Sequence, residues 1–406
     1  MAQYRHILDG YKVLDFSQAV AGPTVTRLMA EMGAEVIKVE IAPVGDPTRL
    51  TFRHGGVRSS LFAQHNRGKK SLCLNPKTAA GSEILKALVP KVDVLVENFS
   101  PGAIGRLGFS YEVVRELNPR VIMCSISAFG QTGPLAQKPG FDTIGGAYAG
   151  IIDVTGELDG APNFPGTALG DTSAGLSAAA SIGFALLHRE RSGKGQYLDI
   201  SLLDAYFHSH ETNVQAYSAS RGAINPTRSG RHSPSYCPCG LYKGRQHYFA
   251  IVAPNPWQWE AVCDVIGHPE LGKHPDFATN DLRVQKLPLI QELVEAWFAS
   301  MPNDEESMRV LDEHHVSAGP VLSIAEAVNH PHLRQRGTVT VLNDRILGPF
   351  EVPASPLRFS DFPQQPPVDA PHLGEHNIEV LRDHLGYSDE RIRRLEADGV
   401  LHSEDR

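Results

Sequence analysis

Apolar residues in roughly the first 130 positions fall into short runs that alternate with stretches of helical periodicity. The run at 11–16 predicts a strand, residues 22–32 predict a helix that ends at Gly33, and 35–39 predict the next strand. Further strands are expected at 70–74, 92–96 and 121–126, with helices at 79–89 and 111–117. This alternation predicts an α/β fold in which helices cover both faces of a parallel sheet.

The second half of the chain has a different pattern. A strand at 195–201 and a helix at 202–217 are followed by a polar stretch, 218–235, whose Arg, Gly, Ser and Pro content predicts a linker. A hairpin at 240–252 and helices at 256–265, 288–299 and 305–313 predict a smaller α+β domain over 236–322. We therefore expect 1–217 to form the first part of a large domain. Residues 323–406, with a β-rich stretch and two closing helices, would return to complete it.

Two common phosphate-binding loops are missing from the sequence. No Gly-x-Gly-x-x-Gly follows the first predicted strand, and Gly-x-x-x-x-Gly-Lys-Ser/Thr does not occur. The sheet is therefore predicted to be Rossmann-like without the usual dinucleotide or triphosphate loop.

Composition limits which binding partners and which cellular compartment are expected. The 406 residues include 38 Lys and Arg against 46 Asp and Glu, a net charge of −8 without a basic block, so nucleic acid is not expected as a partner. No apolar run is long enough to span a membrane, and residues 1–10 do not resemble a signal peptide. We expect a cytoplasmic protein with reduced cysteines. Cys237 and Cys239 lack a second Cys/His pair at zinc spacing, so no metal site is predicted.

The stretch 170–175, Gly-Asp-Thr-Ser-Ala-Gly, places a carboxylate among small residues just before an apolar run. Asp171 has two interpretations. It could cap the following helix by accepting a hydrogen bond from the amide of Ser173 or Ala174. It could also be a nucleophile in a narrow pocket, with flanking glycines that let a large substrate approach the backbone.

Several sequence blocks together resemble one enzyme family. The blocks are 13–17 (Val-Leu-Asp-Phe-Ser), 21–23 (Ala-Gly-Pro), 33–40 (Gly-Ala-Glu-Val-Ile-Lys-Val-Glu), 45–49 (Gly-Asp-Pro-Thr-Arg), 96–102 (Val-Glu-Asn-Phe-Ser-Pro-Gly), 106–109, 118–120, 130–134, 170–171, 193–196, 204–205 and 373–376. In this order they resemble class III CoA-transferases, the family of formyl-CoA and carnitine CoA-transferases and of α-methylacyl-CoA racemase. The resemblance runs from about residue 8 to 400.

The resemblance implies a mechanism and a site. Asp171 matches the aspartate that attacks an acyl-CoA thioester and carries an aspartyl-CoA thioester before a second carboxylic acid takes the CoA. Coenzyme A would enter as substrate, with no tightly bound cofactor. The implied fold is a large Rossmann-like domain plus a smaller α+β domain, in an interlocked homodimer. The predicted CoA contacts are Ala21, Leu72, Asn98, Phe99, Pro101, Arg106 and Lys138, and the block 66–72 resembles a CoA-facing segment.

The substrate and the reaction type rest on fewer positions. Racemases of the family place a histidine where Phe141 stands, beside Asp142, so Phe141 favours CoA transfer over epimerisation. Val20 replaces a glutamine of formyl-CoA transferases, which disfavours oxalate with formyl-CoA. Arg231 and His232 would suit a dicarboxylic or hydroxy-acid acceptor. The alternatives are a racemase of the same family and a non-catalytic CoA-binding protein.

Overall fold

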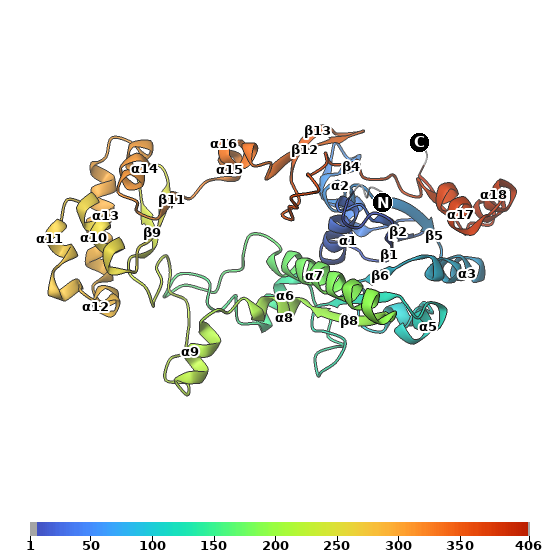
Figure 1. The fold of residues 1–406 in the computed structure, drawn as a ribbon, viewed down its shortest axis with the longest axis horizontal. Helices are drawn as coiled ribbons and strands as arrows, with labels where there is room; N and C mark the ends of the chain where they lie inside the picture. Colours follow the sequence, from blue (N-terminus) through green and yellow to red (C-terminus); the bar gives the residue numbers. More distant parts are fainter. Residues whose placement is uncertain (1–5, 405–406) are drawn as a thin grey trace. The chain divides into compact units, whose positions relative to one another are not determined.

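The computed structural model describes residues 6–404, which form two compact units. The first unit contains the described residues up to 151, residues 164–214 and the residues from 332 on, and the second contains 152–163 and 215–331. The first unit is thus built from N-terminal and C-terminal segments, as predicted. Figure 1 shows the C-terminal segment beside the N-terminal strands.

A six-stranded parallel sheet forms the centre of the first unit. Its strands are β1 (Lys12–Asp15), β2 (Glu35–Ile41), β5 (Lys70–Leu74), β6 (Val94–Glu97), β7 (Ile122–Ser127) and β8 (Gln196–Ser201), in the order β5-β2-β1-β6-β7-β8. Numbered along the chain within this sheet, the order is 3-2-1-4-5-6, that of the Rossmann fold. The predicted α/β class is confirmed.

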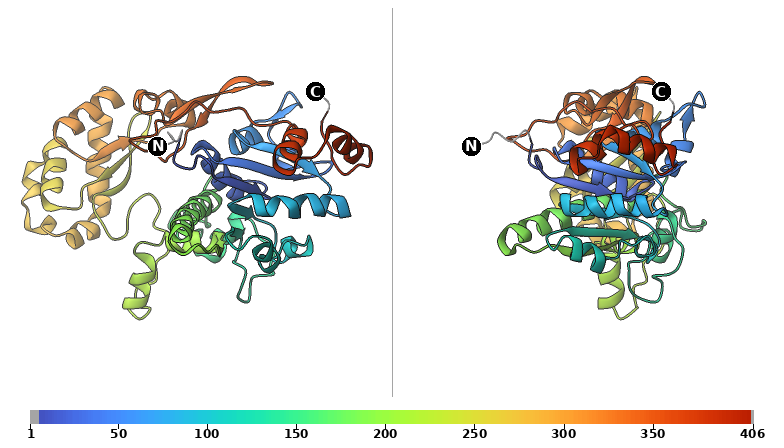
Figure 2. Two further views of the ribbon diagram at one scale, coloured as in Figure 1. Left: turned by 45° about the vertical axis from the view of Figure 1, so that its right-hand side comes forward. Right: turned by 90° about the vertical axis from the view of Figure 1, so that its right-hand side faces the viewer.

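Helices cover both faces of this sheet (Figures 1 and 2). On β1, Val13 contributes to one hydrophobic core and Leu14 to the other, because successive side chains of a strand point to opposite faces. The Val13 face packs against α1 (Ala21–Glu31) and α7 (Leu169–Ser192). The Leu14 face packs against α3 (Ala79–Leu88), α5 (Tyr111–Leu117), α17 (Asn377–Leu385) and α18 (Asp389–Ala397).

The C-terminal segment is fastened to the sheet by polar contacts as well as by packing. Asn377 at the start of α17 accepts a hydrogen bond from the Cys73 amide of β5 at 2.8 Å. The hairpin of β12 (Val339–Asp344) and β13 (Gly348–Pro353) is joined to the N-terminal segment by an ion pair of 2.9 Å between Arg58 and Asp344. The return segment therefore belongs to the same fold as the N-terminal strands.

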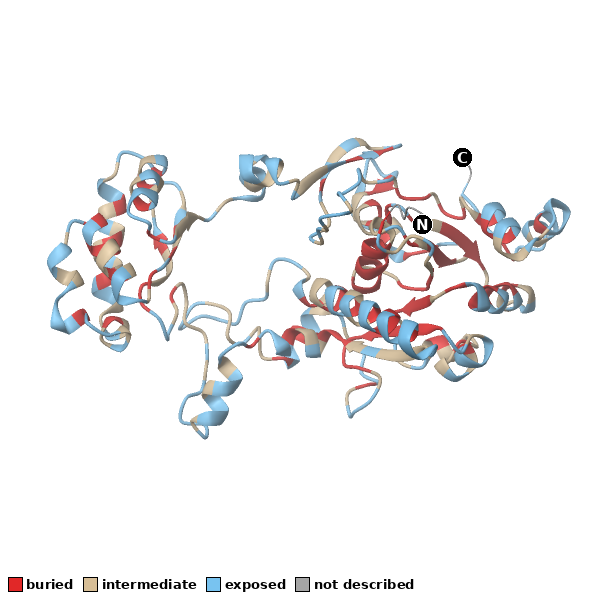
Figure 3. Cartoon of the chain, in the orientation of Figure 1, coloured by how far each residue is buried: buried red, intermediate tan, exposed pale blue. Residues whose placement is uncertain are grey.

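The second unit has its own core. Helices α10 (Pro256–Val265), α13 (Leu287–Ser300) and α14 (Asp304–Glu313) enclose Trp259, Phe249 and Phe298 against an antiparallel sheet. That sheet consists of β9 (Cys239–Lys243), β10 (Tyr248–Val252) and β11 (Ala318–Pro320). Figure 3 shows the buried residues on the inner sides of these helices. The unit is of the α+β class.

The remaining elements are short. They are η1 (Pro47–Leu50), β3 (Arg53–His54), β4 (Arg58–Ser59), α2 (Ser60–Asn66), η2 (Val89–Lys91), α4 (Ala103–Arg106), α6 (Asp142–Tyr148), α8 (Leu202–His208), α9 (Asn213–Ala219), α11 (Pro269–Gly272), η3 (Pro275–Phe277), α12 (Asn280–Gln285), α15 (Ile324–Asn329) and α16 (Pro331–Gln335).

The structure differs from the sequence prediction in the division of one helix and in the boundaries of the two units. The helix predicted at 202–217 is divided into α8 and α9, because buried His210 leaves the helical path and its Nε2 contacts the Ala149 carbonyl at 2.8 Å. Residues 152–163, 215–217 and 323–331, which were expected in the large domain, belong to the second unit. Asp153 pairs there with Arg228 at 2.8 Å, and Gly156 accepts a hydrogen bond from the Gly230 amide.

Candidate active site

Asp171 lies in the first turn of α7, in a position that corrects the capping prediction. The helix begins at Leu169, its N-cap is Ala168, and no side chain of the N-cap residue forms a capping hydrogen bond. Asp171 is therefore inside the helix and does not cap it. A free backbone amide in the first turn of the helix instead donates its hydrogen bond to a residue from a distant part of the chain.

That residue is Asp142, the first residue of α6. Its Oδ1 accepts a hydrogen bond from the Asp171 amide at 2.8 Å, and its Oδ2 accepts one from the Tyr206 hydroxyl at 2.8 Å. A carboxylate at this end of a helix is favoured by the free amides and by the helix dipole. Asp142 therefore fixes the start of α7 and places a second negative charge beside Asp171.

Gly170 makes room for this arrangement. A Cβ at this position would lie 2.2 Å from Cε2 of Tyr206 and 2.9 Å from Oδ1 of Asp142. Both distances are shorter than a side chain tolerates, so any other residue at position 170 would force the Tyr206 ring and the Asp142 carboxylate to move. The Gly-Asp pair of the sequence is thus explained by close packing around the carboxylates.

The environment of Asp171 disfavours its charged form. Burial and, secondly, the negative charge of Asp142 raise the pKa of Asp171 to about 7. Among the described residues no cation forms an ion pair with Asp171 to offset these effects. A half-buried carboxylate that is only partly ionised at neutral pH is poorly solvated, and hence more reactive toward an electrophilic carbonyl than an exposed one.

The start of α7 lies next to the start of α1. A Cβ at Gly175, one turn after Asp171, would lie 2.9 Å from the Ala21 carbonyl oxygen and 2.9 Å from Cβ of Thr24. Helix α1 follows β1, which is paired with β2 on one side and β6 on the other. The strand order reverses direction between β1 and β6, and ligands of open α/β sheets bind beyond the strand ends at such a point.

Several predicted CoA contacts lie at this point of the sheet. Asn98, Phe99 and Pro101 follow directly after β6, and Ala21 begins α1. Asn98 uses its side-chain amide to hold the loop after β1: it accepts from the Gln18 amide and donates to the Gln18 carbonyl, both at 2.7 Å. The structure thus gives Asn98 a contact within the protein that the sequence did not indicate.

Two other predicted contacts carry exposed cationic groups. Arg106 is exposed at the end of α4, after the left-handed Gly102. Lys138 is exposed in the segment before α6, with its Nζ 5.8 Å from the centre of the Tyr148 ring. Both ammonium and guanidinium groups are free to meet a phosphate from solvent.

The block 66–72 corrects a further prediction. Leu72 has no exposed surface and belongs to the hydrophobic core between β5 and the neighbouring helices, so its side chain cannot contact a ligand. Asn66 and Lys69 are buried as well, and Lys69 pairs with Asp15 at 3.0 Å. Leu72 is buried because its strand, β5, is packed on both faces. The local sequence is the same whether a strand leucine faces a ligand or a core, so it does not distinguish the two.

The predicted substrate residues lie in both units. Val20 is the N-cap of α1, and Phe141 precedes α6 with 80% of its surface exposed. Arg231 and His232 belong to the second unit. Arg231 pairs with Glu295 at 3.3 Å, whereas His232 is 8% exposed and stands edge-on to Tyr242 at 4.9 Å. His232 is therefore largely enclosed by its own unit.

Tyr206 is the site residue that sequence reasoning missed. It is buried on α8, five residues after β8 ends, and nothing in the local pattern distinguishes it from an ordinary core aromatic. Only its hydrogen bond to Asp142 reveals its part in the site. Over residues 6–404, no group of three or more His, Cys, Asp or Glu side chains is arranged to hold a metal ion. No helix in that range is long and apolar enough to cross a bilayer.

Comparison with known proteins places this site in a family. The sequence profile described as CoA-transferase family III matches residues 8–377. Formyl-CoA:oxalate CoA-transferase of Streptomyces avermitilis is 35% identical, with 97% of this chain and 99% of the relative covered. Succinyl-CoA:glutarate CoA-transferase of Mus musculus is 33% identical, with 97% and 90% covered. A crystal structure of a CaiB/BaiF family protein from Brucella suis matches with a TM-score of 0.81 at 33% identity, covering 94% of this chain and 100% of that one.

These likenesses extend over nearly the whole chain. The chain belongs to CoA-transferase family III. A CoA-transferase activity with CoA thioesters as substrates follows from this membership.

Proposed function

We propose that this protein moves CoA from an acyl-CoA thioester to a free carboxylic acid through covalent intermediates on Asp171. The observation that carries the proposal is the half-buried Asp171 carboxylate, whose pKa is raised to about 7 and which no described cation neutralises. A carboxylate that is poorly solvated and has no cationic partner is suited to attack a carbonyl carbon.

The proposed reaction consists of four exchanges between carboxylate and thiolate. Asp171 attacks the thioester carbonyl and the carbon–sulfur bond breaks. CoA thiolate departs, and the acyl group stays on Asp171 as a mixed anhydride. The thiolate then attacks the Asp171 carbonyl carbon, which releases the donor acid and leaves an aspartyl-CoA thioester. The acceptor carboxylate attacks this thioester and forms a second anhydride with release of thiolate. Attack of the thiolate on the acceptor carbonyl gives the new acyl-CoA and free Asp171.

The fold supports a place for CoA beyond the ends of β1 and β6. Asn98, Phe99, Pro101 and Ala21 lie around the point where strand order reverses, next to the first turns of α7. In this arrangement Arg106 and Lys138 bind phosphate groups of CoA, because both side chains are exposed cations. The thioester end would then lie near Asp171.

We propose a dicarboxylic or hydroxy acid as acceptor, with Val20, Phe141, Asp142, Arg231 and His232 as candidate substrate residues. The names of two relatives support this class, since oxalate and glutarate are both dicarboxylates. Enclosed His232 is the weakest of these candidates, and Arg231 would have to exchange Glu295 for the substrate carboxylate.

We also propose that the protein is a cytoplasmic homodimer. All five cysteines are free, as expected in a reducing compartment. Helix α7 carries the large apolar side chains Leu176, Phe184 and Leu187, which are 41%, 72% and 50% exposed. A second copy that covers this face would remove the unfavourable contact of these side chains with water. Light scattering coupled to gel filtration measures the molar mass and decides the oligomeric state.

The transfer reaction itself can be tested with defined substrate pairs. Purified protein is incubated with succinyl-CoA plus glutarate, and with formyl-CoA plus oxalate, and new acyl-CoA is measured by liquid chromatography and mass spectrometry. We expect glutaryl-CoA to form at a rate far above that of an Asp171→Ala variant. Absence of any acyl exchange across a wider panel of acids, or solvent deuterium entering the α-carbon of an acyl-CoA without a second acid, would contradict the proposal.

A further inference from the structure

A cluster of buried charges lies beneath the loop that joins β1 to α1. Three acids and three bases form ion pairs at 3.0, 2.9 and 2.6 Å, and five of the six side chains have no exposed surface. The pairs are Lys69 with Asp15, Lys38 with Asp46, and Arg49 with Glu40. The CoA-transfer chemistry proposed above uses none of them.

The cluster arises from the ends of neighbouring strands. Asp15 ends β1 and lies opposite Lys38 in the parallel register with β2. Two residues further along β2, Glu40 points to the same face, because side chains alternate along a strand. Asp46 follows β2 and is the N-cap of η1. A strand buried on both faces would normally be apolar, so charged side chains inside it require a specific reason.

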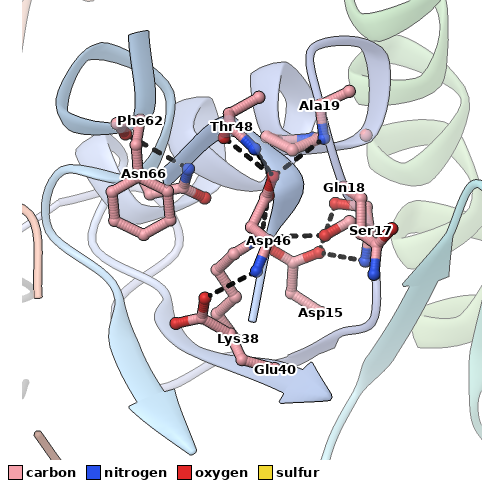
Figure 4. Close-up of polar contacts among 12 residues, drawn as sticks. Asp15, Ser17, Gln18, Ala19, Lys38, Glu40, Asp46, Thr48, Phe62 and Asn66 are labelled. Carbon is pink, nitrogen blue, oxygen red and sulfur yellow. Dashed lines mark hydrogen bonds and ion pairs between the residues drawn. The ribbon is translucent and has the colours of Figure 1, made fainter. Parts of the chain in front are cut away.

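The loop of residues 17–21 is held from three directions. Lys38 donates to the Ser17 carbonyl at 2.8 Å, and Asn98 binds both backbone groups of Gln18 at 2.7 Å. The Ala19 amide reaches Oδ1 of Asp46 at 3.4 Å. Figure 4 shows Asp46 between Lys38, Thr48 and Ala19. Every residue from Ser17 to Ala19 thus has a backbone group bound by a side chain from another element.

The backbone of this loop is strained. Ala19 has a φ of +63°, a left-handed conformation that residues with a Cβ rarely adopt. Such strain persists only where the surroundings impose it, and it is concentrated at functional positions. The residues that impose it here are those that bind its neighbours and its own amide, above all Asp46.

Asp46 connects the loop to the sheet. Its Oδ1 also accepts from the amide and the hydroxyl of Thr48, at 2.9 and 2.7 Å, and its own amide donates to Glu40 at 3.0 Å. One carboxylate thereby fixes the position of η1, of Lys38 and of the loop. The loop continues into Ala21, whose carbonyl oxygen packs against Gly175 on the helix that carries Asp171.

We propose that Asp46 and Lys38 are positioning residues, which hold the 17–21 loop in its strained form against the first turns of α7. The inference rests on the proposed function, because the benefit of a fixed loop is a fixed distance between the CoA thioester and Asp171. Buried ion pairs seldom stabilise a fold more than apolar residues would, so a role in geometry explains this cluster better than stability does.

A matched pair of variants separates position from stability. Asp46→Asn removes the charge but keeps an oxygen acceptor. Asp344→Asn makes the same change in the same unit, at a carboxylate that also pairs with a cation and accepts hydrogen bonds from backbone amides. Asp344 is buried, pairs with Arg58 at 2.9 Å, and accepts from the Ile346 and Leu347 amides at 2.9 and 2.8 Å. Asp344 lies in the β12–β13 hairpin and is not part of the proposed site.

The kinetic readout is kcat and KM for succinyl-CoA with glutarate, or for whichever pair the wild type uses. We expect Asp46→Asn to lower kcat on the order of 100-fold, since small displacements of a bound reactant have effects of this size. Asp344→Asn should remain within about twofold, although both variants lose stability because a buried cation loses one of its carboxylate partners. The double variant Lys38→Met/Asp46→Asn should regain thermal stability while its kcat stays low.

A second readout needs no substrate. Hydrogen–deuterium exchange of a peptide that covers residues 16–22 should be faster in Asp46→Asn and unchanged in Asp344→Asn. Equal kcat losses in the two variants, or wild-type exchange of this peptide in Asp46→Asn, would overturn the inference. Recovery of kcat in the double variant would also overturn it. If the wild type transfers no CoA with any pair, the proposed function fails, and the exchange experiment still decides whether Asp46 holds the loop.

Discussion

The first unit holds one group of buried carboxylates and one group of half-buried carboxylates, and the two groups have opposite electrostatic character. In the cluster beneath the loop, burial opposes the ionisation of Asp15, but Lys69 and Lys38 outweigh it, so the pKa of Asp15 lies below its ordinary value. The same holds for Asp46, which Lys38 and the Thr48 hydrogen bonds keep ionised against the effect of burial. At the start of α7, burial and Asp142 both act against ionisation and raise the pKa of Asp171 to about 7.

The difference shows that burial alone does not decide whether a carboxylate is ionised. Asp15 is more deeply buried than Asp171, yet it is charged and paired, and its oxygens are occupied by Ser17, Thr26 and Lys69. Asp171 has no ion-pair partner among the described residues, and its nearest charged neighbour repels it. A carboxylate whose charge is balanced by a cation is suited to holding a fixed structure. A carboxylate without a balancing cation is suited to attack on an electrophile.

Removal of the carboxylate without a balancing cation should have the largest effect. Asp171→Asn preserves size and helix position but has no nucleophilic oxygen anion, so we expect CoA transfer to fall by more than about 1,000-fold. Initial rates of acyl-CoA exchange measure this. Asp389→Asn, which alters an exposed acid in the first turn of α18, is the control and should retain wild-type rates. Appreciable transfer by Asp171→Asn would remove the distinction between the two groups.

The same variant should be more stable than the wild type above neutral pH. The folded protein holds the Asp171 proton up to about pH 7, whereas the unfolded chain releases it near about pH 4. The folded state binds more protons between these values, so the free energy of unfolding falls as pH rises across this window. Asp171→Asn avoids the loss and should gain about 2–4 kcal/mol at pH 8 and little at pH 4.

Urea unfolding of both proteins at the two pH values measures that gain. Asp15→Asn should show the reverse sign, because the folded state favours the ionised form of Asp15 and its charge stabilises above the unfolded pKa. Equal pH dependence in the two variants would contradict the comparison.

Close packing around the carboxylates should make Gly170 intolerant of any side chain. Gly170→Ala forces a methyl group into Tyr206, and we expect about 1–3 kcal/mol of destabilisation together with a loss of activity near tenfold. Gly183→Ala on the same helix is the matched control. Within a single chain nothing lies within 4 Å of a Cβ there, so the fold of one chain should tolerate the methyl group and the helix should gain up to about 1 kcal/mol. Thermal unfolding and initial rates distinguish the two, and similar behaviour would show that Tyr206 yields easily.

The smallest expected effect concerns pH. Transfer requires ionised Asp171, so the wild-type rate should rise with pH and reach half its maximum near pH 7. Asp142→Asn keeps an acceptor for the Asp171 amide and removes the repelling charge, so the midpoint should move to lower pH while the plateau rate changes by less than about tenfold. A pH–rate profile measures both. A midpoint that stays in place would show that burial alone determines the pKa of Asp171.

The parts of the fold that sequence predicted well are those with strong local signals. The β1–α1–β2 unit and α10 were expected within a few residues, because apolar periodicity and Gly or Pro at the ends determine them. The role of Asp171 at its helix end could not be predicted in the same way. The cap comes from Asp142, 29 residues earlier in the chain, and no local rule encodes that distance.

Buried polar groups were equally hard to foresee. Lys69 lies in the block 66–72, which was expected by family resemblance to face CoA, but here it is enclosed with Asp15. The prediction that Leu72 contacts CoA was also wrong, because a core leucine and a ligand-facing leucine have the same neighbours in sequence. Likewise, the break between α8 and α9 depends on a tertiary contact of His210. In each case a partner far along the chain decides the outcome.

In the proposed mechanism, Asp171 becomes covalently bonded to the acyl group and then to CoA during turnover. The most direct test is incubation with a panel of acyl-CoAs and hydroxylamine, followed by peptide mass spectrometry with Asp171→Ala as control. Hydroxylamine converts an aspartyl thioester or anhydride to a hydroxamate and releases CoA or the acid. We expect a hydroxamate at Asp171 with one or a few donors. A modified peptide elsewhere, or transfer without any adduct at Asp171, would contradict it.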